Sequence, residues 1–357
     1  MIISACLMLA ALLDGAANLP DDNLPLDLPE SFSGQIVIGH RDGILVQASR
    51  GLADRAGQVP VTPETLFDMG SLTKQITAAG VVLLAGEGRL SLQEPLSAFF
   101  ETLPRDIAGR TVHDLLVHTA GLPQYSGGDY DPVDRSAFSA WLATADTSEV
   151  APGTFHYSNP GYSMAARIIE MRSGEDFESF VQTRLLAPAG IGDIGYRNLP
   201  DDRVEAIGYR GGEAQGRPSE QPWLEDGPSW NLRGNGGLLT TADALYRWTL
   251  ALTGGGVLDE AHRPCCSRRI RSGTPSGAYH TAMAGMCSGR ARHAVSIIPG
   301  AIWFSSPMSS GSRSLIASSL SPAMPSTNRT SARSSARPVP RYCAPRPVAP
   351  PASSSAR

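Results

Sequence analysis

The distribution of acidic residues divides this chain into two unequal parts. All 34 Asp and Glu residues lie within residues 1–260, whereas residues 261–357 contain none and carry thirteen arginines. In ordinary folded domains roughly a quarter of the residues are charged, and the two signs are mixed. The two parts were therefore not shaped by the same constraints, and we expect a single folded domain over residues 32–262.

The folded part is long enough to bury a sizeable core. The chain has 357 residues, of which 41% are hydrophobic, as in ordinary soluble proteins. The five cysteines of the chain are divided in the same way, because none of them lies between residues 7 and 264. We therefore expect neither a disulfide nor a thiolate metal site in the domain, and the motifs below call for no metal or cofactor.

The first 31 residues precede the predicted domain. Residues 1–17 combine a short apolar run with small residues at 15–17, which is typical of a signal peptide, although no Lys or Arg precedes the run. Residues 18–31 are rich in Pro and Asp and are interpreted as a linker. These features predict a periplasmic or secreted protein without a transmembrane segment once the signal is removed.

The hydrophobic pattern predicts strands first, then helices, then a return to sheet. Strands are expected at 35–39 and 44–48, with a hairpin turn at 41–43, and a further strand-like run is expected at 234–239. Helices are expected at 72–85, 111–117, 161–171, 177–186 and 241–252. This order indicates an α+β fold, an antiparallel sheet flanked by helices, with a helical subdomain.

Several helix ends carry their own signals. Thr111 is followed three residues later by Asp114, which is close to a capping box. Gly174 is expected to end the helix that begins near residue 161. Either Thr240 or Thr241 could cap the helix that follows.

The only lysine of the chain, Lys74, follows Ser71 by three residues. Residues three apart on a helix share a face, so the amine could reach the hydroxyl and deprotonate it. A lysine acts as a base only if its pKa is lowered, which burial or a nearby cation could do. Alone the S-x-x-K pattern is weak, and a surface Ser and Lys on a helix explain it equally well.

A second pair of polar residues, Tyr157 and Asn159, lies in a turn before a predicted helix. A phenol can relay a proton to a leaving group, and an amide can orient an acyl substrate. A turn with a buried tyrosine explains the same residues, because Asn-Pro-Gly at 159–161 is good turn chemistry.

Four motifs occur in order, and together they resemble a known superfamily. They are the runs at 66–74, 115–122, 152–162 and 234–243. The chain resembles the serine β-lactamase-related superfamily, with class C β-lactamases, D-alanyl-D-alanine carboxypeptidases and related esterases as the nearest types. The resemblance covers about residues 32–262.

The resemblance implies a role for each motif residue. Ser71 would be the acylated nucleophile, Lys74 its proton acceptor, and Tyr157 and Asn159 the Y-x-N pair; Asn159 would bind substrate. His118, in the second run, would be a core or turn residue. The expected substrate is a small molecule or a peptidoglycan-like peptide with an amide, lactam or ester bond.

The third motif of the superfamily, K-T-G or H-x-G on an edge strand, has no convincing copy. The tripeptides 271–273 and 287–289 fit it only loosely. We hypothesise that residues 263–357, rich in Ser, Arg, Pro and Ala, are a frameshifted reading of the C-terminal part, which would leave the fold incomplete and this tail without ordered structure. A basic tail that binds nucleic acid is not favoured, because it contains Trp303 and Phe304.

Two functions therefore remain open from the sequence. The intact motifs favour a serine hydrolase that works through an acyl-enzyme at Ser71. The missing third motif favours a catalytically inactive, truncated homologue or a non-catalytic binding protein, since the edge strand also supplies a donor to the oxyanion hole.

Overall fold

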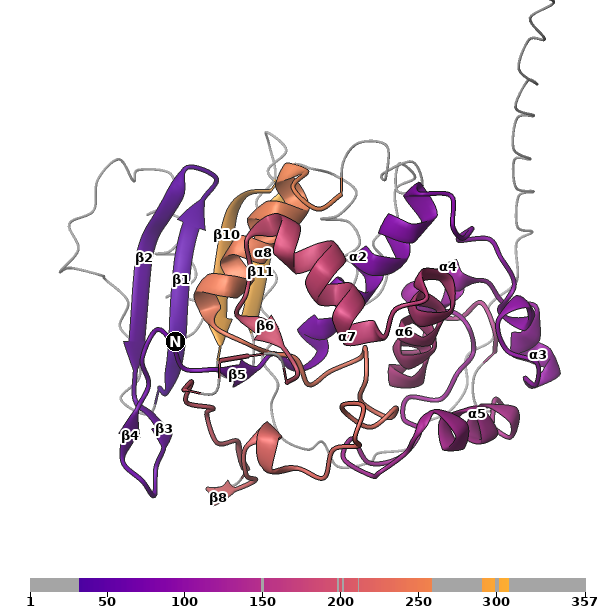
Figure 1. Cartoon of the computed structure of the whole chain (residues 1–357), viewed down its shortest axis with the longest axis horizontal. Coiled ribbons are helices and arrows are strands. Elements are labelled where there is room, and N and C mark those ends of the chain that lie inside the picture. Colours follow the sequence, from indigo (N-terminus) through magenta and orange to yellow (C-terminus); the bar gives the residue numbers. More distant parts are fainter. Residues whose placement is uncertain are drawn as a thin grey trace, which may run out of the picture. The chain divides into compact units, whose positions relative to one another are not determined.

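The structure is a computed structural model that describes residues 32–148, 151–197, 199–200, 202–210, 212–258, 291–298 and 302–307. It combines an antiparallel sheet with a group of helices, as Figure 1 shows, which confirms the predicted α+β class. The predicted signal peptide and linker lie outside the described residues.

The predicted N-terminal hairpin is confirmed. Strand β1 (Gly34–His40) pairs with β2 (Gly43–Arg50) in antiparallel register, and the two are joined by a tight turn at residues 41–42. The residues of β1 are almost all buried, whereas most of those of β2 are partly or fully exposed. β1 is thus the more buried strand of this hairpin.

The sheet continues beyond the hairpin into the acid-free tail. β10 (Ala291–Ile298) pairs with β1 and β11 (Ile302–Pro307) pairs with β10, which gives the strand order β11-β10-β1-β2. The sequence predicts no ordered structure over 263–357, whereas the structure describes these two strands there; the bounds of the tail stay a prediction. Main-chain pairing requires no acidic side chains, and the free edge of β1 offers unpaired donors and acceptors.

These strands count against the frameshift hypothesis, which had no place for an ordered continuation of the sheet. Because the hypothesis concerns the gene, it stays a prediction, and sequencing codons 255–270 from fresh template would test it. The two loose candidates for the third motif, at 271–273 and 287–289, lie outside the described residues.

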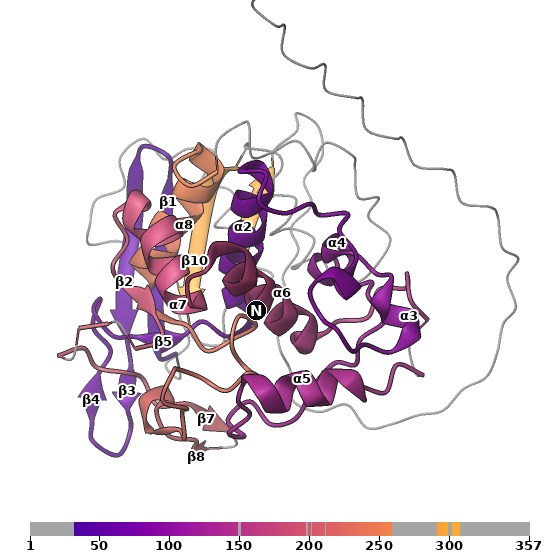
Figure 2. The ribbon, with the colours of Figure 1, turned by 45° about the vertical axis from the view of Figure 1, so that its right-hand side comes forward.

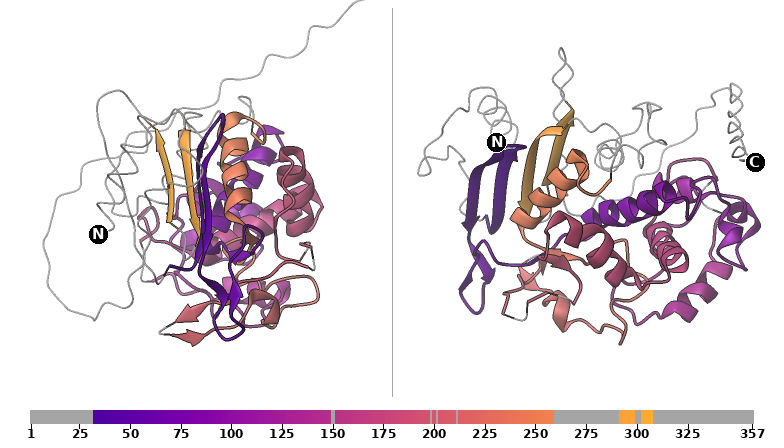
Figure 3. Two further views of the ribbon diagram at one scale, coloured as in Figure 1. Left: turned by 90° about the vertical axis from the view of Figure 1, so that its left-hand side faces the viewer. Right: turned by 45° about the horizontal axis from the view of Figure 1, so that its top comes forward.

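One face of the sheet is covered by α8 (Ala242–Gly254), which packs on β1 and β10. Figure 3 shows this helix beside the strands in its edge-on view. Thr241 is the N-cap, since its side chain accepts a hydrogen bond from the backbone N–H of Ala244, so the choice between Thr240 and Thr241 is settled. Packing is close: a Cβ at Gly39 would lie 2.6 Å from the Tyr246 hydroxyl.

Short strands connect the sheet to the helices. β3 (Leu52–Asp54) pairs with β4 (Val59–Pro60), and β7 (Tyr209–Arg210) pairs with β8 (Glu213–Ala214). A three-stranded sheet has the order β5-β9-β6, made of β5 (Phe67–Asp68), β9 (Leu239–Thr240) and β6 (Ile194–Gly195). The strand predicted at 234–239 is wrong except at its last residue. Its glycines instead form turns, in which the N–H groups of Asn235 and Gly236 both donate to the carbonyl of Leu232.

The helices form the other part of the fold. They are α2 (Thr73–Gly86), α3 (Arg105–Ala108), α4 (Val112–Leu116), α5 (Arg135–Ala143), α6 (Asn159–Ser173) and α7 (Phe177–Phe180), which continues as a π-helix, η3 (Val181–Leu186). Single 3₁₀ turns, η1 (Gly70–Leu72), η2 (Leu96–Ala98), η4 (Ala187–Ala189) and η5 (Pro218–Glu220), lie between them. None of the helices in the described part of the chain has the length and hydropathy that crossing a membrane requires.

Helix α2 lies at the centre of this group and packs against α6, as Figure 2 shows. Its residues from 73 to 84 are all buried, so the helix is enclosed on every side. A helix in this position can hold a polar side chain such as Lys74 away from water.

The predicted helix signals at α4 and α6 are confirmed. Thr111 and Asp114 form a complete capping box at α4. Gly174 ends α6 with a φ of 79°, a left-handed conformation that favours glycine. The helix begins two residues earlier than predicted, because Ser158 caps it and Pro160 is tolerated in a first turn.

Candidate active site

Ser71 lies in the tight turn between β5 and α2. Gly70 has a φ of 51°, and its N–H donates to the Asp68 carboxylate over 2.7 Å. The N–H of Met69 donates to the carbonyl of Leu238 over 2.9 Å, next to the pairing of β5 with β9. Ser71, the nucleophile predicted from the sequence, thus follows a glycine turn that is tied to Asp68 of β5 and to Leu238, the residue before β9.

Lys74 occupies the first turn of α2, and only 3% of its surface is exposed. Its Nζ lies 2.9 Å from Oδ1 of Asn159, 2.6 Å from the carbonyl oxygen of Asn235 and 3.3 Å from Oγ of Ser71. Two N–H donors are therefore committed to fixed acceptors. In the neutral amine, the remaining position is a lone pair directed at the Ser71 hydroxyl.

Burial changes the proton affinity of this amine. Desolvation lowers the pKa of Lys74 from its ordinary value to about 7, while the charge of Asp129 acts in the opposite direction. Near neutral pH a large fraction of the amine is consequently unprotonated. A lowered pKa is the condition that a lysine base requires.

Tyr157 lies on the other side of Ser71. Its hydroxyl is 2.8 Å from Oγ of Ser71, and Nζ of Lys74 lies 4.9 Å from the centre of its ring. Tyr157 and Asn159 flank Ser158, the N-cap of α6, so the capping of this helix places both polar groups toward Lys74. All four residues predicted from the sequence are brought together.

His118 has the core position expected of it. It is 3% exposed, and its backbone adopts a φ of 58°. Its Nδ1 accepts a hydrogen bond from the N–H of Ser158 over 3.1 Å, and its ring lies 4.6 Å from that of Tyr157. The histidine therefore supports the turn that carries Tyr157.

The sequence missed the contribution of Asn235. Its carbonyl makes the shortest contact of Lys74, and its side-chain amide donates to Oγ of Ser163 over 2.9 Å and to the carbonyl of Asn231 over 2.8 Å. The Asn between glycines at 234–236 was visible, but the run was interpreted as a strand. Nothing local indicates that a carbonyl in a turn will meet a lysine 161 residues away.

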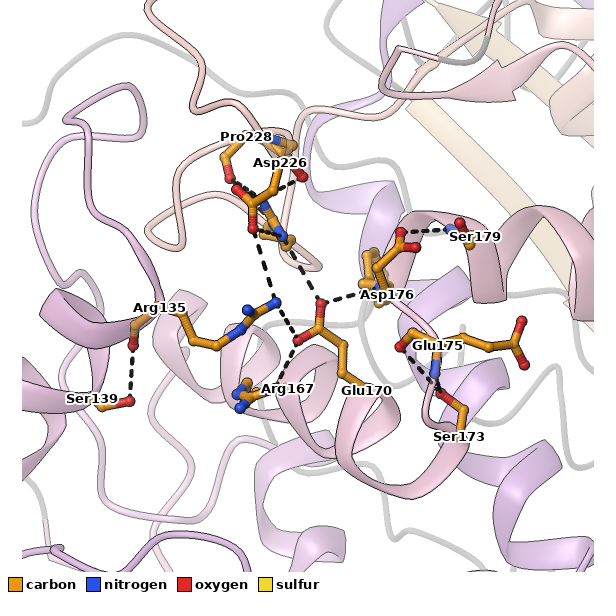
Figure 4. Close-up of polar contacts among 12 residues, drawn as sticks. Arg135, Ser139, Arg167, Glu170, Ser173, Glu175, Asp176, Ser179, Asp226 and Pro228 are labelled. Carbon is orange, nitrogen blue, oxygen red and sulfur yellow. Dashed lines mark hydrogen bonds and ion pairs between the residues drawn. The ribbon is translucent and has the colours of Figure 1, made fainter.

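Residues 226–237, here called the 226–237 loop, are held by a cluster of charged side chains, shown in Figure 4. Glu170 on α6 is 3.0 Å from Arg135 and 2.9 Å from Arg167, while Arg233 of the loop is 3.0 Å from Asp226 and 3.9 Å from Glu170. Glu170 and Arg233 are nearly inaccessible to water. The turn that presents Asn235 is thus anchored to α5 and α6.

The loop also fits closely against the central helices. Thr77 donates to the carbonyl of Gly234 over 2.6 Å, and a Cβ at Gly234 would lie 2.5 Å from Cβ of Ala166. The hydroxyl of Tyr196 accepts from the N–H of Gly234 and donates to the carbonyl of Gly236. Among the described residues, no group of three or more His, Cys, Asp or Glu side chains is placed to hold a metal ion.

Comparisons with known proteins place this geometry in a family. The family model described as Beta-lactamase matches residues 28–314, which extends beyond the 262 predicted from the motifs. Penicillin-binding protein 4* of Bacillus subtilis is 30% identical over half of this chain and 41% of its own length. Esterase EstB of Burkholderia gladioli is 30% identical over 51% of each chain.

A solved structure agrees with these relatives. The crystal structure of a penicillin-binding protein from Bacillus halodurans is 27% identical and covers 65% of this chain and 74% of its own, with a TM-score of 0.52. The chain spans about half the length of the curated relatives that it matches. The match of the family model over most of the sequence, with Ser71, Lys74 and Tyr157 in contact, shows that this chain belongs to the beta-lactamase family.

Proposed function

We propose that the chain is a serine hydrolase that cleaves a small amide, lactam or ester through an acyl-enzyme at Ser71. The observation that carries the proposal is the arrangement around Lys74. Its buried amine has two donors committed to Asn159 and Asn235 and lies 3.3 Å from the serine oxygen. A lowered pKa of about 7 gives this amine the proton affinity of a general base.

In the acylation step, neutral Lys74 accepts the proton of Ser71 while Oγ attacks the substrate carbonyl. The new C–O bond forms as the carbonyl electrons move to the oxygen, giving a tetrahedral oxyanion. Its collapse breaks the bond to the leaving group, which takes up a proton. Tyr157 is placed to deliver that proton, because its hydroxyl contacts Ser71 directly and its ring contacts the protonated amine.

In the deacylation step, water attacks the ester carbonyl of the acyl-enzyme. A proton passes from water to the Tyr157 and Lys74 pair, the acyl product leaves as the acid, and Oγ of Ser71 regains its proton. Asn159 holds Lys74 over 2.9 Å and would orient the acyl group of the substrate. The names of the relatives, a penicillin-binding protein and an esterase, support both the amide and the ester classes.

Covalent labelling tests the proposal directly. The full chain is treated with a fluorophosphonate probe and with a fluorescent penicillin. We expect at least one of them to attach stoichiometrically, and mass spectrometry should place the adduct on Ser71. Ser71→Ala should abolish labelling, because the nucleophile is gone, while its circular dichroism spectrum stays unchanged.

The alternative is an inactive homologue or a non-catalytic binding protein. Folded wild-type chain that neither probe labels, and that hydrolyses no 4-nitrophenyl ester, would favour this alternative. The absence of a recognised third motif from the sequence is the observation behind it.

We also propose that the chain is exported, to the periplasm or the medium, on the strength of the apolar run at 2–13 and the small residues at 15–17. N-terminal sequencing of the mature protein tests this. A mature chain that retains Met1 would contradict it.

A further inference from the structure

A cleft of about 640 Å³ lies beside the three-stranded sheet β5-β9-β6. It is lined by β4, by β9, by residues next to β5 and β6, and by side chains between positions 199 and 223. Its volume falls within the range of small-molecule sites, roughly 300–1,000 Å³. The four predicted site residues, Ser71, Lys74, Tyr157 and Asn159, are not among the described residues of this lining. The cleft is therefore distinct from the proposed hydrolase site.

Three arginines line the cleft, and two of them are already paired with carboxylates. Nη2 of Arg203 lies 3.1 Å from Oδ1 of Asp193. Nη2 of Arg217 lies 2.9 Å from Oδ2 of Asp54, and its Nη1 lies 2.8 Å from Oε1 of Glu220. These two guanidinium groups are consequently committed to the fold.

The third arginine, Arg197, is held in place without a carboxylate. Its guanidinium donates to the carbonyl oxygens of Leu224 and Glu225 and lies 5.4 Å from the centre of the Trp223 ring. Within the part of the chain that the structure describes, it makes no ion pair, and three of its five N–H groups make no hydrogen bond. A guanidinium fixed in this way, with donors to spare, is suited to a carboxylate.

Much of the remaining lining is apolar or aromatic. Leu66, Leu239 and Tyr196 are at most 3% exposed, whereas Val204 is 40% exposed. Trp223 meets Tyr196 edge-on, with 5.8 Å between the ring centres. Apolar surface at Val204 is thus available to a bound ring, and covering it would be favourable.

We propose that this cleft is a second binding site, which takes a small aromatic monocarboxylate. The carboxylate would pair with Arg197, and the ring would cover Val204 and Trp223. An anion is favoured because the described lining holds three arginines and a single carboxylate, Glu205. A single charge is favoured because only one of the three guanidinium groups lacks an acidic partner among the described residues.

An occupant of this cleft would also contact a residue that shapes the proposed hydrolase site. Tyr196 lines the cleft, and its hydroxyl accepts from the N–H of Gly234 over 3.0 Å and donates to the carbonyl of Gly236 over 2.9 Å. These two glycines flank Asn235, whose carbonyl holds Lys74. The binding proposal goes beyond the hydrolase function and does not depend on it.

The test uses two ligands that differ in charge but not in shape, naphthalene-2-carboxylate and 2-naphthamide. Calorimetric titration into the full chain at pH 7 should give a Kd of about 1 mM or lower for the carboxylate. The amide should bind about three- to tenfold more weakly, as expected for loss of a partly exposed charged hydrogen bond. Equal affinities for the two ligands, or no binding of either, would overturn the proposal.

Variants of Arg197 assign the preference to one side chain. Arg197→Gln removes the charge but keeps a donor for the neighbouring carbonyls, and it should abolish the preference for the carboxylate. Arg197→Lys should retain most of it. Arg105→Gln removes the same charge at an exposed position outside the cleft and should match the wild type. A preference that survives Arg197→Gln would place the carboxylate elsewhere and refute the proposal.

Two further measurements locate the ligand without relying on Arg197. Val204→Trp adds a ring at an exposed position of the lining and should weaken the binding of both ligands, because it fills the cleft. Naphthalene-2-carboxylate should shift the indole N–H resonance of Trp223, assigned with Trp223→Phe. Unchanged affinity in Val204→Trp, or an unshifted Trp223 resonance at saturation, would contradict the assignment. The fluorophosphonate label of Ser71 reports separately on the hydrolase function.

Discussion

Two loops of this protein, the 226–237 loop and residues 124–131 (the 124–131 loop), are held in very different ways. The 226–237 loop is anchored through buried charges, with Arg233 3% exposed and in contact with Asp226 and Glu170. The 124–131 loop is held by hydrogen bonds to Asn231, and Asp129 near its tip is exposed and unpaired within the described residues. The first loop holds Lys74 through the carbonyl of Asn235, whereas the second carries an exposed acidic side chain.

The glycines of the two loops show the same contrast. At Gly234 the backbone is left-handed, with a φ of 79°, and an added Cβ would meet the Cβ of Ala166 at 2.5 Å. At Gly128 the nearest atoms to an added Cβ would be those of the Asp131 carboxylate, at 3.0 Å and beyond. Gly234 thus faces Cβ of Ala166 and the backbone of Tyr162, which cannot move aside, whereas Gly128 faces the end of a side chain, which can.

The largest expected effect comes from the buried charge cluster. Glu170→Gln leaves Arg233, Arg135 and Arg167 without their shared carboxylate, and breaking a buried pair costs about 3 kcal/mol or more. For a domain of this size we expect Tm to fall by roughly 6–12 °C in thermal unfolding. Asp131→Asn in the 124–131 loop, where Oδ2 accepts from the N–H of Gly128, should cost only about 1 kcal/mol. Equal losses would remove the distinction between the loops.

The second prediction compares the two glycines. Gly234→Ala should destabilise the protein by about 2 kcal/mol, because it adds backbone strain to a contact with no room. It should also slow the labelling of Ser71, since the shift reaches Asn235. Gly128→Ala should change the free energy of unfolding by less than about 1 kcal/mol in urea titrations. If Gly128→Ala proved the more damaging, the 124–131 loop would be the more tightly packed of the two.

The smallest effect concerns pH. Lys74 must be unprotonated to act as a base, so the second-order rate of Ser71 labelling should rise with pH, with a midpoint near 7, and then level off. Because the charge of Asp129 raises the pKa of Lys74, Asp129→Asn should move this midpoint to lower pH. A wild-type midpoint near the ordinary lysine value would show that the amine is not desolvated in solution.

Much of the local structure could be predicted because its causes lie within a few residues of each other. The capping box of Thr111 with Asp114, the cap at Thr241 and the stop at Gly174 each involve one helical turn. The spacing of Ser71 and Lys74 likewise follows from the helical repeat. Their pairing with Tyr157 and Asn159 was inferred from the resemblance and is found in the structure.

The failures share a different cause. The glycine-rich run at 234–239 was interpreted as a strand, since its pattern does not reveal that Tyr196 and Thr77 bind its backbone. Strands β10 and β11 were not predicted, because the expectation for residues 263–357 rested on amino-acid composition. Pairing with β1 depends instead on main-chain groups that every sequence carries.

The sequence by itself determined which groups this protein has for chemistry and where its helices begin and end, because those features depend on residue identity and short-range geometry. Only the tertiary structure decided that Lys74 is buried, that the carbonyl of Asn235 holds it, and that Asp129 acts on it. Burial and charge proximity are set by segments far apart in the chain, so they follow from packing and not from any local pattern.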